Sequence, residues 1–285
     1  MSIRSRRTFL ERCAAGLSAA GALTAATDRA SALPLGMPVG FQLYSVREKA
    51  ARDFPGTLRE LAASGYRSVE LCSFAGYGDF KPLATMKAGE AKALIRSAGM
   101  RCESCHYTPA EMRNHLDERI AYARELGLKY MVLSSFGLKP EATLDDWRRA
   151  ADDLNPVGER VSKAGMQLGF HNHNNEFKEM DGVLIYDELM KRLDPRLVKM
   201  QFQCAVISIG FDPVTYLTQY PGRFCSLHLA DWSKEEKKMV ALGRGVVDWK
   251  KVFQAAKTAG VKNYFVEMSP ELLKESSRYL QDLKA

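Results

Sequence analysis

Side chains that can bind metal ions or move protons recur along the sequence, each at the end of a short apolar run. His171 and His173 follow one run, and His228 and Glu267 end two others. Four of the five histidines, His106 included, occupy such positions. Imidazole and carboxylate groups from separate segments suit a divalent cation such as Mn²⁺, Mg²⁺, Co²⁺ or Zn²⁺. The pattern predicts a metal site if these segments end at one place in the fold.

Side-chain alternation indicates which of these groups can converge. In a strand, residues two apart point to the same face, so His171 and His173 share a face. Glu267 shares its face with Phe265 by the same rule. The remaining apolar runs also end in polar residues, among them Gln42, Glu70 and Gln203.

A repeated unit of helix, glycine and strand must position these groups. Each predicted helix ends in small residues and a glycine, where a left-handed backbone costs glycine no Cβ clash. The glycines are Gly65, Gly99, Gly127, Gly165 and Gly260. The predicted strands are 39–44, 67–72, 101–106, 129–134, 166–171, 198–203, 224–229 and 263–267. Strands that alternate with helices in this way predict an α/β fold, the (β/α)₈ TIM barrel, whose active sites lie at the carboxyl ends of the strands.

A doubly wound open sheet is the competing architecture. It usually has five or six strands and a glycine-rich first turn, and no such turn follows the first strand here. The segment Gly243–Asp248 has a G-x-G start but ends in Asp where a dinucleotide fingerprint needs glycine. The barrel is therefore the favoured prediction.

Several segments resemble the sugar phosphate isomerase/epimerase family, which has a xylose isomerase-like TIM barrel. They are Leu168–His173, Val198–Gln203, Tyr220–His228, Gly243–Trp249 and Tyr264–Met268. The resemblance extends over essentially all of residues 33–285. It implies metal ligands at the ends of strands five to eight, which here are His171, Gln203, His228 and Glu267.

Two of these positions depart from the pattern of the family. His171 stands where many relatives have Glu, and Gln203 stands where they have Asp. A site with one carboxylate holds a hard cation less strongly than a site with three, although Gln203 could still coordinate through its carbonyl oxygen.

The resemblance implies an enzyme that removes a proton next to the carbonyl of a non-phosphorylated sugar or keto-sugar. Glu267 or His173 is the expected base. Gln42, Glu70 and His106 are expected to bind the substrate, while Trp232 and Phe41 are candidate stacking surfaces. The outcome would be isomerisation or epimerisation. The alternative within the superfamily is a lyase or hydratase acting on 3-keto-glycosides.

Two other classes of function are weighed against an enzyme of this kind. A non-catalytic sugar-binding relative would keep the pocket without turnover. An endonuclease of similar fold needs a strongly basic face, and the sequence beyond residue 32 has no Lys/Arg run with interleaved aromatic residues. The expected partner is therefore a small sugar, and nucleic acid is not expected.

Residues 1–32 resemble a twin-arginine signal peptide. Arg6 and Arg7 precede a mildly apolar run, and Ala30-Ser31-Ala32 offers a cleavage site. The run is too short and too rich in Ala and Gly for a membrane anchor, which needs about 20 strongly apolar residues. Removal of 32 of the 285 residues leaves 253, close to the roughly 250 of a (β/α)₈ barrel. A periplasmic protein with one domain over residues 33–285 is the expectation.

Cysteine usage argues against a disulfide framework. Five of the six cysteines lie beyond residue 32, and an odd number cannot all pair. Cys102 and Cys105 form a C-x-x-C motif, but within a strand these positions point to opposite faces. A redox or zinc role for this motif is not expected.

Overall fold

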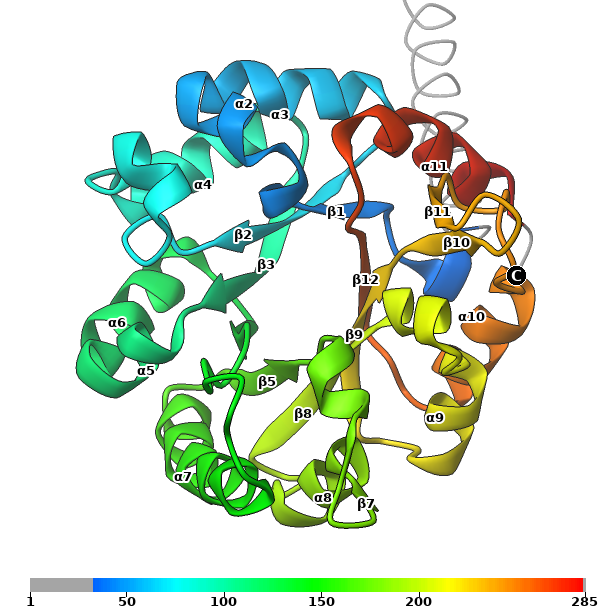
Figure 1. The fold of residues 1–285 in the computed structure, drawn as a ribbon. Helices are drawn as coiled ribbons and strands as arrows, with labels where there is room; N and C mark the ends of the chain where they lie inside the picture. Colours follow the sequence, from blue (N-terminus) through cyan, green and yellow to red (C-terminus); the bar gives the residue numbers. More distant parts are fainter. Residues whose placement is uncertain (1–32, 284–285) are drawn as a thin grey trace, which may run out of the picture.

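Eight parallel strands close into a barrel with helices on its outside (Figure 1). This computed structural model describes residues 33–283 of the chain. The strand order around the barrel is β1-β12-β9-β8-β5-β4-β3-β2. The barrel strands are β1 (Gly40–Gln42), β2 (Ser68–Cys72), β3 (Arg101–Tyr107), β4 (Tyr130–Leu133), β5 (Gln167–His171), β8 (Val198–Gln203), β9 (Phe224–Leu229) and β12 (Asn263–Val266). The predicted (β/α)₈ barrel is confirmed.

Helices follow the strands and pack against the outer face of the barrel (Figure 1). They are α2 (Arg47–Arg52), α3 (Phe54–Ala63), α4 (Ala88–Ser97), α5 (Pro109–Asn114), α6 (Leu116–Leu126), α7 (Leu144–Lys163), α8 (Ile185–Arg192), α9 (Pro213–Gln219), α10 (Trp249–Thr258) and α11 (Pro270–Asp282). Helix α7 begins with a capping box between Thr143 and Asp146, in which each side chain accepts a backbone N–H from the other residue.

The connections between these elements contain short 3₁₀ helices and two small antiparallel hairpins. The 3₁₀ helices are η1 (Pro34–Gly36), η2 (Leu43–Val46), η3 (Gly78–Leu83), η4 (Asn174–Phe177) and η5 (Cys204–Ile209). The hairpins are β6 (Glu179–Met180) with β7 (Val183–Leu184), and β10 (Asp231–Ser233) with β11 (Lys238–Val240). The second hairpin, β10–β11, follows β9 almost directly.

The five glycines predicted to end helices all have positive φ angles, between 70° and 101°. At Gly65, the turn closes through a hydrogen bond from the Tyr66 N–H to the Leu61 carbonyl. A left-handed residue is needed for this closure, which explains why glycine recurs at the junction between helix and strand.

The main apolar core lies between the barrel and its helices. Its largest fully buried side chains include Trp249, Tyr66, Phe41 and Phe253. Phe41 packs edge-to-face on Tyr66, with 5.3 Å between ring centroids, and burying a ring of this size contributes about 2 to 3 kcal/mol. The suggestion that Phe41 stacks on a substrate is therefore wrong, because its side chain lies in the core away from the barrel interior.

Several sequence predictions concern features outside or beside the barrel. The predicted signal peptide, residues 1–32, lies outside the described residues. No described helix combines the length and apolar character needed to cross a membrane. The described cysteines, Cys102 and Cys105 of the C-x-x-C motif among them, are free thiols.

Candidate active site

A buried carboxylate, Glu70 of β2, lies at the centre of the polar cluster inside the barrel. It is 0% exposed. Its two oxygens accept hydrogen bonds from Gln42 (2.7 Å), Ser104 (2.5 Å), Gln201 (2.7 Å) and His228 (2.5 Å). Burial alone would raise the pKa of Glu70, but the neighbouring imidazoles of His106 and His228 lower it. A charged group satisfied by this many donors can remain ionised in the interior.

His228 of β9 bridges Glu70 to a second carboxylate. Its Nε2 lies 2.5 Å from Glu70 and its Nδ1 lies 2.9 Å from Glu267. Burial opposes a charge on the imidazole, but Glu267 and Glu70 raise the pKa of His228 to about 9. Both ring nitrogens therefore carry protons at neutral pH in the absence of a competing ligand.

Glu267 directly follows β12 and reaches solvent at the mouth of the barrel, where its side chain is 24% exposed. Besides His228, it accepts a hydrogen bond of 2.5 Å from the amide nitrogen of Gln203. Burial would raise the pKa of Glu267, but the His228 cation and its hydrogen bond lower it to about 2. The side chain is an anion across the physiological range.

Gln203, the last residue of β8, has its amide oxygen turned away from this cluster. The oxygen accepts the backbone N–H of Ala205 at the start of η5, at 3.1 Å, while the nitrogen faces Glu267. A neutral amide therefore occupies the position where the family pattern has a carboxylate. Coordination through this oxygen remains a prediction that requires the side chain to turn.

Three histidines form a group that could hold a metal ion. One ring nitrogen from each of His106, His171 and His228 lies within 4.8 Å of the others. Burial lowers the pKa of His106 and, together with the charge of His228, moves that of His171 well below its usual value. Neutral imidazoles keep a lone pair for a metal. The Nδ1 of His171 is buried without a hydrogen-bond partner, so the residues present fit such an ion.

The predicted site residues are thus brought together in part. His171 and Glu267 approach within 4.0 Å, and His173 stands edge-on to His171 with ring centroids 4.7 Å apart. Trp232 lies in the β10–β11 hairpin, where it pairs with Met239. Its backbone N–H donates to Asp231, and among the described residues no hydrogen bond joins its side chain to the cluster, so its role in substrate binding stays a prediction.

Gln42 and Glu70 are less exposed than Glu267 at the barrel mouth. Both are 0% exposed, and the amide nitrogen of Gln42 donates to Glu70. His106 is nearly as buried, and its Nε2 lies 2.6 Å from the Gln201 amide oxygen. The assignment of Gln42, Glu70 and His106 to substrate binding stays a prediction, although the hydrogen bond between Gln42 and Glu70 already occupies part of their polar groups.

Three residues of this network were missed in the sequence: Ser104, Gln201 and Ser226. Gln201 donates to both Glu70 and Ser226 through its amide nitrogen. Ser104, Gln201 and Ser226 each lie two residues before a predicted site residue in β3, β8 and β9. The two-residue period of a strand was the signal that could have found them.

The fold is a closed parallel (β/α)₈ barrel, and its histidines and carboxylates lie at the carboxyl ends of the strands. Enzymes with this fold carry their active sites at the same end of the barrel. The chain belongs to the xylose isomerase-like TIM barrel family, whose sequence model matches residues 58–283. The resemblance to this family seen in the sequence is confirmed.

The chain is also similar to curated relatives and to a solved structure. An inosose dehydratase from Lacticaseibacillus casei is 27% identical over 151 residues, covering 47% of this chain and 50% of the relative. One from Geobacillus thermodenitrificans is 28% identical over 173 residues, covering 50% and 57%. The chain thus spans about half the length of these relatives. A sugar phosphate isomerase/epimerase from Parabacteroides distasonis superposes with a TM-score of 0.72 at 28% identity, covering 85% and 93%.

Proposed function

We propose that this protein is an enzyme that removes the proton next to the carbonyl group of a non-phosphorylated keto-sugar and then eliminates water or another leaving group. The observation that carries the proposal is the ionised, partly exposed Glu267 beside neutral His171 at the barrel mouth. A divalent metal held by His171, His228 and Glu267, with His106 as a further nitrogen ligand, would polarise the carbonyl oxygen of such a substrate.

The ligand and base roles fall to different residues. A carboxylate with a pKa of about 2 is a weak base, so Glu267 is better suited to bind a cation than to accept a proton. His173 is exposed at the mouth, and partial desolvation there lowers its pKa, so it is neutral at neutral pH. We therefore assign proton abstraction to His173.

Elimination is favoured over epimerisation by two considerations. The curated relatives described above are named inosose dehydratases, and a dehydratase eliminates water from its substrate. Epimerisation also needs a proton-transfer group on each face of the substrate, and Glu70, the second carboxylate of the cluster, is fully buried. Isomerisation or epimerisation is the second candidate, supported by the likeness to the Parabacteroides protein.

A phosphate group on the substrate is disfavoured, because the carboxylates Glu70 and Glu267 of the cluster would repel it.

Paired variants separate the two roles. His173→Gln should keep the bound metal and lower turnover by roughly 10² to 10⁴, the usual effect of losing a general base. Glu267→Gln should lower turnover by a similar factor and lose metal, and it should also lower the melting temperature because the amide no longer balances the charge of His228. His115→Gln is the control, because His115 is an exposed histidine outside the cluster.

The measurements are elemental analysis after loading with Mn²⁺, Co²⁺ or Zn²⁺, and NMR of keto-sugars in deuterium oxide. Solvent deuterium should enter the substrate, and an unsaturated ketone should appear if elimination follows. Deuterium uptake without that product would favour epimerisation. Less than about a tenth of an equivalent of each metal, or His173→Gln turning over like the parent, would refute the respective assignment.

A further inference from the structure

A cavity of about 440 Å³ opens beside the barrel mouth, between the loop that follows β4 and the segment that follows β5. Aromatic and aliphatic side chains from both segments form much of its wall, among them Phe136, Trp147, Met180 and Ile185. Phe136 and Trp147 meet edge-to-face with 6.0 Å between their ring centroids. His173 also lines this cavity, so the cavity adjoins the candidate active site.

Glu176 supplies one deeply buried polar group to this wall. Its side chain is 2% exposed, and one carboxylate oxygen accepts the backbone N–H of His173 at 2.8 Å. Burial raises the pKa of Glu176 to about 7. A carboxyl group set among apolar side chains can fix the orientation of a ligand that carries a hydroxyl group.

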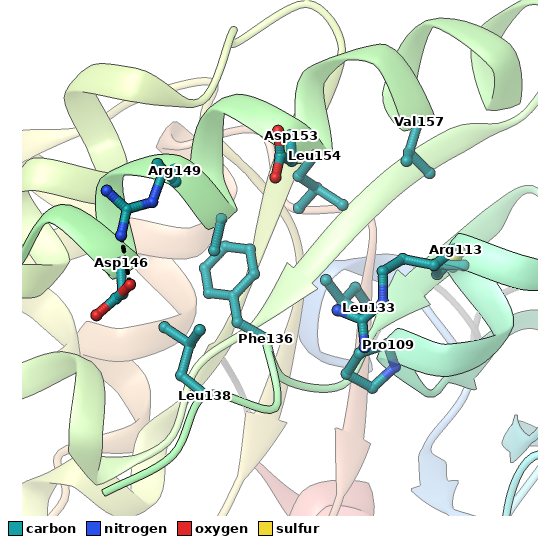
Figure 2. Close-up of a pocket in the computed structure, with 12 residues that line it drawn as sticks. Pro109, Arg113, Leu133, Phe136, Leu138, Asp146, Arg149, Asp153, Leu154 and Val157 are labelled. Atoms are coloured by element: carbon teal, nitrogen blue, oxygen red, sulfur yellow. Dashed lines mark hydrogen bonds and ion pairs between the residues drawn. The ribbon is translucent and has the colours of Figure 1, made fainter. Parts of the chain in front are cut away.

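A second cavity, on the outer side of the same loop, serves as a comparison. Figure 2 shows this smaller cavity of about 280 Å³, lined by residues of α5 and α7 such as Arg113, Leu154 and Val157. Phe136 and Leu138 line both cavities. None of the candidate active-site residues lines the cavity of Figure 2.

We propose that the cavity beside His173 binds an apolar, preferably aromatic, substituent of the substrate while the sugar ring occupies the barrel mouth. This inference rests on the proposed function. The barrel mouth presents Glu267, His171 and Gln203, which suit a ring bearing hydroxyl groups. The adjoining wall combines polar side chains such as Asn175 with Phe136, Trp147, Met180 and Ile185, so it adds apolar surface beside the polar barrel mouth. A glycoside with an aryl group matches both surfaces, and a cavity of this size lies within the roughly 300 to 1,000 Å³ of small-molecule sites.

The test compares two probes that differ only in this substituent: p-nitrophenyl β-D-glucopyranoside and methyl β-D-glucopyranoside. The nitrophenyl compound should bind about 10-fold more tightly by calorimetry, because it buries an additional aromatic ring. It should also quench tryptophan fluorescence, and Trp147→Phe should remove most of the quenching, because Trp147 lines the cavity. Trp232→Phe is the matched control.

Two further variants locate the binding site. Ala142 lines the proposed cavity and is partly exposed, so Ala142→Phe should weaken binding of the nitrophenyl compound by about 10-fold and leave the methyl compound unchanged. Ala150→Phe, in the cavity of Figure 2, should affect neither. Equal affinity for the two probes, or an Ala142→Phe variant that binds like the parent, would overturn the inference.

Because the readout is binding, failure of this inference is distinguishable from failure of the proposed function. A protein that prefers the aryl compound but exchanges no substrate proton contradicts the function and supports the cavity. A protein that turns over keto-sugars without any preference for an aryl group contradicts only the inference about the cavity.

Discussion

His228 is held between two carboxylates, and this arrangement has opposite consequences for stability and for metal binding. With its pKa raised to about 9, the imidazole gains a proton on folding at neutral pH. That proton stabilises the metal-free protein through Glu70 and Glu267. A metal ion must displace this proton, so the same contacts that stabilise the metal-free protein make metal binding release a proton.

The pH dependence of the metal-free protein follows from this shift. The pKa of His228 is raised on folding, so its contribution to stability is complete below the usual value of about 6.5 and is lost as the pH rises toward 9. His106 and His171 have lowered pKa values, so their contributions change below about 6.5 and stay constant above it. Between pH 7 and 8 the free energy of unfolding should therefore fall by about 1 kcal/mol.

Urea denaturation in the presence of a chelator, at several pH values, measures this slope. His228→Gln should remove most of the slope and leave the smaller contribution of Glu176, whose pKa is raised to about 7. His115→Gln should leave the slope unchanged because His115 is exposed. The range stops at pH 8, since thiols of the unfolded chain ionise at higher pH. A stability that rises from pH 7 to 8 would show that His228 is neutral in the folded protein.

Gln203→Asp tests the position that departs from the family pattern. The parent amide donates to Glu267, and Asp would replace this hydrogen bond with repulsion between two carboxylates. The variant should be less stable than the parent without metal, by about 1 to 3 kcal/mol, yet should bind Mn²⁺ or Co²⁺ more tightly. Titration calorimetry measures metal binding, and denaturation with and without metal measures stability. The control is Gln219→Asp, at an exposed position. Gln201→Asp would not serve, because Gln201 donates a hydrogen bond to Glu70.

Much of this site could be predicted from the sequence because side chains alternate along a strand and the barrel strands end at the same mouth. The ends of the strands and the two-residue alternation place His171, His228 and Glu267 together without any knowledge of side-chain contacts. Depth within the barrel is not encoded in the same way. Glu70 and Glu267 both belong to strand ends in the sequence, yet one is fully buried and the other reaches solvent.

At the level of the elements, Asp231 organises the loop that leads from β9 to α10. Its buried carboxylate accepts five hydrogen bonds, from the backbone N–H groups of Trp232, Gly243, Gly245 and Val247 and from the indole N–H of Trp249. A Cβ atom on Gly245 would lie 2.1 Å from the Asp231 carboxylate. Gly245 of the Gly243–Trp249 motif therefore permits the backbone to approach Asp231.

Removing the charge of Asp231 should loosen this loop. In Asp231→Asn, one oxygen becomes an NH₂ group that faces N–H donors, so the unfolding free energy should fall by about 2 to 4 kcal/mol. Asp248→Asn is the matched control, because Asp248 is exposed and caps α10 through a single backbone bond to Lys251. The control should lose about 1 kcal/mol or less. Equal losses in urea denaturation would mean that Asp231 is not the organising residue.

The elements themselves were predicted more completely than their connections. Helix-ending glycines and apolar runs indicate local backbone states, and these survive in the barrel. The predicted first strand, 39–44, is shorter in the structure because residues 43–46 form η2, whose start is capped by the Gln42 amide oxygen. The β10–β11 hairpin was not predicted, because its strands, Asp231–Ser233 and Lys238–Val240, are too short to show an alternating pattern.

At the scale of the whole molecule, charge and the first 32 residues bear on where the protein works. The chain has a formal net charge of +7. Residues 1–32 contain five arginines, Glu11 and Asp28, so their removal would lower the charge by three, to about +4. A modest positive charge of this size is typical of a solvated surface. The excess of arginine in residues 1–32 suits a targeting segment.

We propose that the protein is exported by the twin-arginine route, which the segment resembles in its arginine pair, apolar run and Ala30-Ser31-Ala32 site. The twin-arginine route is used for proteins that fold before export. A reporter that is active only when folded is therefore the suitable cargo. Residues 1–40 fused to such a reporter should direct it to the periplasm, as measured by fractionation. Arg6→Lys with Arg7→Lys should leave the reporter in the cytosol, because recognition depends on the arginine pair and not on positive charge alone.

The matched control is Arg4→Lys with Arg12→Lys, which conserves the same charge outside the pair and should export like the parent. Export of both double variants would mean that the segment uses a route insensitive to the arginine pair. Retention of the parent fusion in the cytosol would refute the export proposal.

Folding before export would also determine where the metal site is loaded. His106, His171 and His228 are each no more than 5% exposed, so a chain that folds before export would close around its metal in the cytosol. Metal content of the exported protein should then follow the cytosolic supply and not that of the medium, which growth with a chelator confined to the medium would test.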